Sequence, residues 1–151
     1  MNPSTPTQLT NLILTVFQLN GRLLDWGNDF SARHGLTSAR WQILGAIALS
    51  EHAPTAPQLA AFMGITRQGA QKQLKLLQQD GLIQAEQNRL HKRSPVFTLT
   101  PQGRQAFNAI DTQWNAHAAQ LAAGFSRDQL HTAHAVLTSL IQHHQPQDTA
   151  P

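Results

Sequence analysis

Cysteine is absent from the 151 residues of this chain. Disulfide bonds, thiolate metal sites and cysteine-based sensing of peroxides are therefore excluded. Charged residues are also scarce, at 13% of the chain, and the formal net charge of +3 is small. No glycine-rich phosphate loop, ordered nucleophile–base–acid set or pair of carboxylates stands out. We therefore do not expect an enzyme.

A long uninterrupted apolar run is missing as well. Near the N-terminus the apolar residues are broken by Gln18, Asn20, Arg22 and Asp25. Such a segment matches neither the core of a signal peptide nor a membrane span. We expect a soluble cytoplasmic protein of about one domain. It would have either one modest core, or a compact part plus further helices that complete their core in a dimer.

Positive charge is concentrated in one part of the chain. Residues 67–104 contain seven basic and two acidic side chains, whereas the remaining residues contain four basic and six acidic ones. Basic charge gathered in this way is typical of a surface that binds double-stranded DNA. An ordinary solvated face is the alternative when charge alone is considered.

The same part of the chain contains two short helical patterns that meet at a tight turn. The first follows a Thr55-x-x-Gln58 capping signature and stops at Gly64. The second is predicted from Thr66 to Asp80, with Ala70, Leu74 and Leu77 on one side and most of its polar residues on the other. A helix with this division can pack inward and contact DNA outward.

A hairpin follows the second helix. Two short strands, residues 82–86 and 95–99, flank a basic loop at residues 88–94. With a preceding helix at residues 37–50, the order predicts a mainly α fold. The head, residues 37–100, would be a winged helix-turn-helix of three helices and a two- or three-stranded β wing.

Helices are predicted on both sides of this head, in residues 1–36 and 101–151. One runs from Thr5 to about Arg33, and others begin at Thr100 and Ser126, where capping residues precede helical patterns. All are amphipathic and carry more apolar surface than isolated helices leave in water. We infer a helical dimerisation region built from both termini, because most operator-binding proteins with such a head are twofold dimers.

Side chains of the predicted head differ in the DNA contacts that they suit. Gln68, Gln71 and Lys72 suit base edges, because glutamine pairs with adenine and lysine with guanine acceptors. The remaining basic residues suit phosphates, and Arg89 and Arg93 are the best candidates for a minor groove. The predicted DNA-binding residues are Thr66, Arg67, Gln68, Gln71, Lys72, Lys75, Arg89, Lys92 and Arg93.

Four segments together carry a resemblance to a known family. They are Leu36-Thr37-x-x-x-Trp41-x-Ile43-Leu44, Leu59-Ala60-x-x-Met63-Gly64-Ile65-Thr66-Arg67-Gln68, Leu77-x-x-x-Gly81-Leu82-Ile83 and Leu99-Thr100-x-x-Gly103-Arg104. In order and spacing they resemble the multiple-antibiotic-resistance (MarR) family of winged-helix transcription regulators. The resemblance covers nearly the whole chain. It implies a homodimeric repressor that binds a pseudo-palindromic operator and is released by a small ligand.

Two positions depart from the family pattern. The wing commonly carries an aspartate two residues before an arginine, and here His91 stands at the aspartate position before Arg93. An imidazole cannot hold Arg93 as a carboxylate would. Gly69 is the second departure, because glycine inside a recognition helix costs about 1 kcal/mol relative to alanine. It would either let the backbone approach DNA closely or loosen the first turn.

The resemblance also implies a ligand site. Family members often bind small aromatic anions between the dimerisation helices and the head. The residues that would form such a crevice here offer aromatic walls and one or two cationic groups for a carboxylate: Trp26, Phe30, His34, Arg40, Trp41 and Leu44. Aromatic residues at helical spacing are otherwise plain core.

The sequence also offers alternatives to this function. Among the eight histidines, His131 and His134 share a helix face and His143-His144 lie near the C-terminus. Solvated surface histidines are favoured, a zinc site is a minor alternative, and neither a metal nor a cofactor is predicted. The rival functions are a ligand-independent architectural DNA binder and a winged-helix protein-interaction module.

Overall fold

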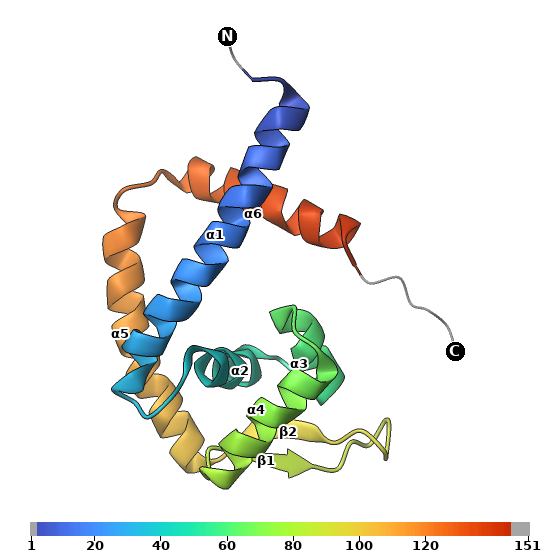
Figure 1. The fold of residues 1–151 in the computed structure, drawn as a ribbon. Coiled ribbons are helices and arrows are strands. Elements are labelled where there is room, and N and C mark those ends of the chain that lie inside the picture. Colours follow the sequence, from blue (N-terminus) through green and yellow to red (C-terminus); the bar gives the residue numbers. More distant parts are fainter. Residues whose placement is uncertain (1–2, 146–151) are drawn as a thin grey trace. The chain divides into compact units, whose positions relative to one another are not determined.

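The computed structural model describes residues 3–145, which form a mainly helical fold with one small sheet (Figure 1). The chain divides after Ile110 into two compact units. In the described part, no helix is long and apolar enough to cross a membrane. The elements, in chain order, are α1 (Thr5–Ala32), α2 (Ser38–Leu49), α3 (Ala56–Met63), α4 (Arg67–Gln79), β1 (Ile83–Glu86), β2 (Val96–Leu99), α5 (Pro101–Ala122) and α6 (Arg127–His143).

The helix-turn-helix is formed by α3 and α4, and its local signals are those predicted. The Thr55 side chain accepts a hydrogen bond from the Gln58 backbone while the Gln58 side chain bonds back to the Thr55 backbone. At the other end of α3, Gly64 has a φ of 64°, a left-handed conformation that glycine adopts without a steric penalty. Thr66 then caps α4 by accepting a hydrogen bond from Gly69 N–H at 3.0 Å.

The core of the first unit lies between the inner faces of these helices and the sheet. From α4 it receives Ala70, Leu74 and Leu77, as the apolar pattern predicts. The other members come from α2, α3, the sheet and the first half of α5, and they include Ile43, Leu44, Leu59, Leu82, Ile83, Phe97, Phe107 and Ile110. One side of α4 is thus anchored, which leaves its opposite side facing solvent.

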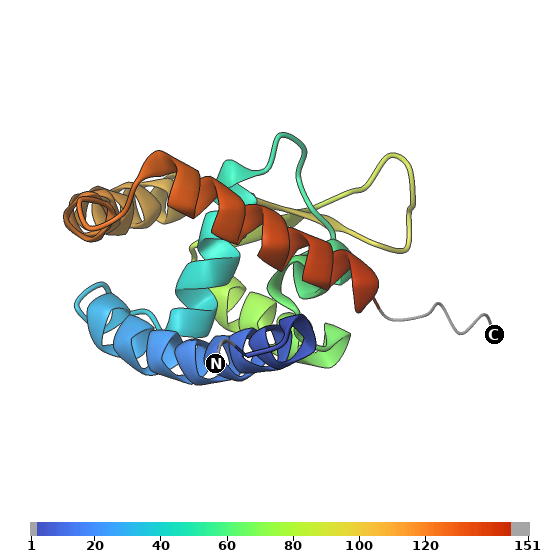
Figure 2. The ribbon, with the colours of Figure 1, turned by 90° about the horizontal axis from the view of Figure 1, so that it is seen from above.

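The wing is an antiparallel pair of strands, with a register that runs from Ile83↔Leu99 to Glu86↔Val96. The third strand allowed by the sequence is reduced to one bridge between Thr55 and Val96. A hydrogen bond of 2.9 Å from Phe97 N–H to Pro54 O accompanies this bridge. The loop between β1 and β2 projects outward from the head (Figure 2).

The Leu-Thr-x-x-Gly segment after the wing has a clear physical basis. The Thr100 hydroxyl donates to Gly81 O at 2.6 Å and accepts from Gly103 N–H at 3.0 Å. This places the start of α5 so close to the strand that a Cβ at Gly103 would lie 1.8 Å from Leu82 O. Only glycine fits there without a backbone shift.

The helices outside the head were predicted to form a dimerisation region from residues 1–36 and 101–151. The compact units divide differently, because α1 packs against α2 in the first unit and α5 is shared between the two. In the second unit, a capping box at Ser126 and Gln129 begins α6 as predicted. No residue of α6 is buried within this chain. The dimerisation role of these segments stays a prediction.

Candidate nucleic-acid interface

The outward side of α4 presents the polar residues that the sequence singled out. Ala70, Leu74 and Leu77 are buried on the inner side of the helix. The exposed residues on the opposite side are Arg67, Gln68, Gln71, Lys72 and Lys75. No acidic residue occurs in the first turn of α4. The positive end of the helix dipole therefore adds to the basic side chains at the N-terminal end of the helix.

Gly69 contributes to the cap of α4. Its N–H bonds the Thr66 hydroxyl, and a Cβ at this position would lie 3.1 Å from that oxygen. Gly69 is half-buried rather than open to solvent. A side chain here would therefore crowd the cap, which is a structural reason for glycine that the sequence did not reveal.

In the wing loop, a residue that the sequence did not single out organises the tip. Asn88 is buried, and its side-chain oxygen accepts a hydrogen bond of 3.0 Å from Leu90 N–H. A second bond, 3.1 Å from Ser94 N–H to His91 O, closes the far side of the loop. The predicted contact residues Arg89, Lys92 and Arg93 are all exposed around this turn. The signal that could have found it is an asparagine in a loop, because its side chain commonly accepts a hydrogen bond from the backbone N–H two residues on.

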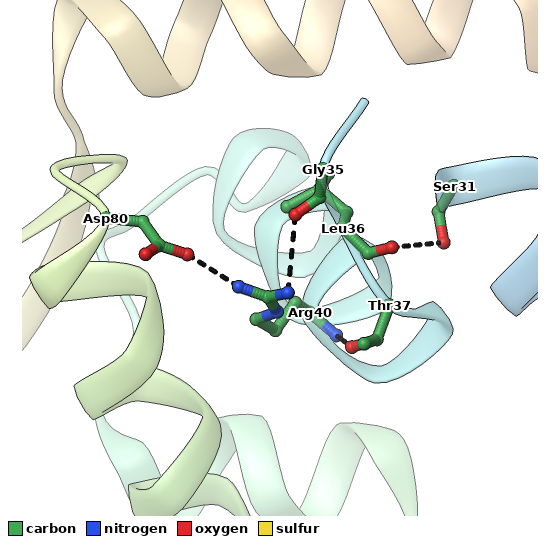
Figure 3. Close-up of polar contacts among 6 residues, drawn as sticks. All are labelled: Ser31, Gly35, Leu36, Thr37, Arg40 and Asp80. Atoms are coloured by element: carbon green, nitrogen blue, oxygen red, sulfur yellow. Dashed lines mark hydrogen bonds and ion pairs between the residues drawn. The ribbon is translucent and has the colours of Figure 1, made fainter. Parts of the chain in front are cut away.

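Arg40 connects the loop before α2 to the end of α4 (Figure 3). Its guanidinium lies 2.5 Å from the Asp80 carboxylate, and another guanidinium nitrogen donates to Gly35 O at 3.3 Å. The hydroxyl of Ser31 lies 3.1 Å from Leu36 O, which holds the same loop to the end of α1. A chain of polar contacts thus runs from α1 to α4.

The residues predicted to form a ligand crevice are partly gathered. The rings of Trp26 and Phe30 stack with centroids 4.7 Å apart, and the ring of Trp41 lies 5.0 Å from that of Phe30. These three rings and His34 are half-buried. Leu44, in contrast, is fully buried in the core of the head. The structure therefore brings the aromatic residues together, with Arg40 next to Trp41 in sequence but bonded to Asp80.

A separate groove of about 820 Å³ lies between the end of α2, α3 and the wing. Its lining includes Glu51, Phe62, Leu90 and Val96, and none of the six predicted ligand-binding residues.

The histidines that suggested a metal alternative lie in α6 and at its end. His131, His134, His143 and His144 are exposed. The rings of the last two lie against backbone carbonyls, at 2.8 Å from Ser139 O and 2.7 Å from Leu140 O. Among residues 3–145, no three His, Cys, Asp or Glu side chains lie together in a way that would hold a metal ion.

The anchored helix, its basic outward side and the wing define a winged helix-turn-helix of the DNA-binding type. The family model for the MarR family matches residues 34–94. A MarR family transcription regulator of known crystal structure is 30% identical and superimposes with a TM-score of 0.74 over 91% of both chains. An uncharacterised protein of Mycobacterium tuberculosis is 40% identical over 103 residues, which are 68% of this chain and 71% of that one. This chain belongs to the MarR family of DNA-binding transcription regulators.

The fold also occurs in proteins that are less similar in sequence. The transcriptional regulator MosR of M. tuberculosis, crystallised in complex with DNA, has a TM-score of 0.70 at 22% identity, over 89% of this chain and 98% of that one. At that identity the likeness concerns the fold alone.

Proposed function

We propose that this protein is a homodimeric, sequence-specific repressor that a small aromatic or anionic effector releases from its operator. The observation that carries the proposal is the amphipathic character of α4. Its apolar face packs in the core, while its glutamines and cationic side chains face solvent. A helix held in this way can enter a major groove and present side chains to base edges. We assign no catalytic role to any residue.

In this proposal, Gln68, Gln71 and Lys72 contact bases and the flanking cations contact phosphates. The wing enters the adjacent minor groove with Arg89 or Arg93. Two recognition helices of a dimer would then read half-sites about 10 base pairs apart, centre to centre. The MosR structure, in which a protein of this fold was crystallised with DNA, supports this use of the head.

Exposed apolar residues support the homodimer. Along α1, large side chains that face solvent within this chain include Leu9, Leu14, Phe17, Leu19 and Leu23. On α6 no residue is buried within this chain, and its exposed apolar residues include Leu130, Val136, Leu137 and Ile141. Apolar surface of this extent marks an interaction site. A second copy of the chain is the occupant that a twofold operator requires.

The effector site is proposed at the aromatic cluster of Trp26, Phe30 and Trp41, with Arg40 as the cation. Among proteins of the same fold, a Staphylococcus aureus MarR was crystallised with salicylate and kanamycin; its TM-score is 0.65 at 24% identity. Salicylate is a small aromatic anion of the expected kind. In this chain an effector carboxylate that reaches Arg40 would compete with Asp80, and would thereby loosen the end of α4.

Selection of binding sites from a random duplex library tests the function. The purified protein is expected to enrich a pseudo-palindrome whose half-sites lie about 10 base pairs apart. An architectural DNA binder would enrich no sequence, and a protein-interaction module would retain no duplex at physiological salt. Either result would contradict the proposal.

A further inference from the structure

The tip of the wing carries an apolar side chain in an unusual setting. Leu90 is 88% exposed, and no other large hydrophobic residue of the described chain is as exposed. A single exposed leucine is common on protein surfaces and needs no function. The surroundings of Leu90, however, are both ordered by hydrogen bonds and strongly basic.

The hydrogen bonds define where Leu90 sits. Its own N–H is held by the buried side chain of Asn88, and the bond from Ser94 N–H to His91 O closes the loop behind it. Asparagine in such a turn substitutes for a backbone acceptor two residues before the bonded N–H. The backbone of Leu90 is therefore positioned by a built turn, which limits the conformational entropy that binding would cost.

The charges near Leu90 indicate which kind of partner molecule it contacts. Arg89 precedes Leu90, Lys92 and Arg93 follow it within three positions, and all three are exposed; no acidic residue occurs between Glu86 and Asp111. A cationic rim of this kind complements a polyanion. DNA offers an apolar surface inside a polyanionic rim where two base pairs separate, because the faces of the bases are apolar and phosphates line both edges of the groove. Architectural proteins insert leucine and similar side chains between base pairs from the minor groove in this way.

We propose that Leu90 inserts from the minor groove between adjacent base pairs of the operator and bends the duplex, while the flanking cations hold the phosphates. This inference rests on the proposed function, in which the wing enters the minor groove. Because pyrimidine–purine steps unstack most easily, the wing adds a preference for a TA or CA/TG step at a position where no hydrogen bond reads the base.

The bend is measured by energy transfer between dyes at the two ends of a selected duplex, with the full-length protein. Leu90→Ala is expected to straighten the bound duplex and to weaken binding roughly tenfold, as expected when the burial of a leucine side chain is lost. Leu90→Met should retain the bend. Leu49→Ala is the matched control, because Leu49 is 76% exposed at the end of α2, outside the wing.

The dependence of affinity on salt separates this role from a phosphate contact. Leu90→Ala should weaken binding by the same factor at every salt concentration, because no counterion is released by an apolar contact. Arg93→Ala should instead lower the slope of log affinity against log salt by about 1. Thermal denaturation of each variant verifies that the wing change leaves the fold intact.

A bend and an affinity that are the same in Leu90→Ala and the wild type would overturn the inference, as would an unbent duplex in the wild-type complex. Neither result would affect the proposed function, which depends on the selection of a twofold sequence. Failure of the wild type to select any sequence would instead remove the proposed function, and the inference with it.

Discussion

Arg40 and Asp80, forty positions apart in the sequence, form an ion pair that joins the start of α2 to the end of α4. Asp80 is the C-cap of α4, where the helix dipole disfavours a negative charge. The guanidinium of Arg40 offsets that cost and also bonds Gly35 O in the loop after α1. The orientation of α4 is thus connected to the loop that leads from α1.

Removal of the Asp80 charge tests the competition proposed for the effector. Asp80→Asn should bind salicylate more tightly than the wild type, by about fivefold, because an ion pair of this exposure contributes only about 1 kcal/mol or less. Arg40→Gln should lose salicylate binding. Isothermal titration calorimetry measures both affinities.

Glu86→Gln is the control for that experiment, because Glu86 is an exposed acid of the head that bonds Gln84 and Thr98 rather than Arg40. Its salicylate affinity should match that of the wild type. Equal affinities in Asp80→Asn and the wild type would show that the effector does not compete for Arg40.

Replacement of Gly103 tests the close approach of α5 to the sheet. Gly103→Ala should lower the free energy of unfolding by about 3 kcal/mol or more, because the added Cβ has to displace the backbone at Leu82. Gly21→Ala, in the middle of α1 with nothing within 4 Å of the added Cβ, should instead raise it by about 0.5–1 kcal/mol. Urea denaturation measures the difference. Similar stabilities of the two variants would contradict the packing described at Gly103.

Two substitutions in the head separate base contacts from phosphate contacts. Gln71→Ala should relax the preference at one base position at a cost of about 1–3 kcal/mol, with the salt slope unchanged. Arg93→Ala should weaken binding to all sequences and lower the salt slope by about 1. Binding to the selected operator and to its single-base variants, titrated with salt, distinguishes them. Equal losses on operator and scrambled DNA for Gln71→Ala would refute this division of roles.

A charge placed on the exposed apolar face of α1 or α6 tests the homodimer. Phe17→Glu and Ile141→Glu should dissociate the dimer, because each would bury an unpaired carboxylate in the proposed interface. Leu49→Glu, an equally exposed apolar position in the head, should leave the dimer intact. Sedimentation velocity gives the mass of each species. A wild-type protein that sediments as a monomer at micromolar concentration would remove the dimer from the account.

Local signals in the sequence predicted most of the fold. Thr55, Thr66 and Ser126 cap the helices that they were expected to cap, because a cap depends on residues within three positions of it. The inner side of α4 was also predicted, since its apolar period identifies Ala70, Leu74 and Leu77 without knowledge of the rest of the fold.

Features that depend on tertiary contacts were not predicted. The sequence suggested Arg40 as a free cation for a ligand, and only the fold brings Asp80 to it. The steric demand at Gly103 arises from the backbone of Leu82, which precedes β1 and is distant from Gly103 in the sequence. Leu44 was included among the residues of the ligand crevice, whereas in the structure it is buried in the core of the head. The roles predicted for individual residues in DNA binding and effector binding stay predictions.

Competition binding tests the central claim most directly. The purified protein is titrated into fluorescent DNA from the region upstream of its own gene, at about 150 mM salt, with scrambled duplex as competitor. The account predicts binding in the nanomolar range that excess scrambled DNA does not displace. Weak binding that scrambled DNA displaces equally well, on this DNA and on every sequence selected from the random library, would contradict it.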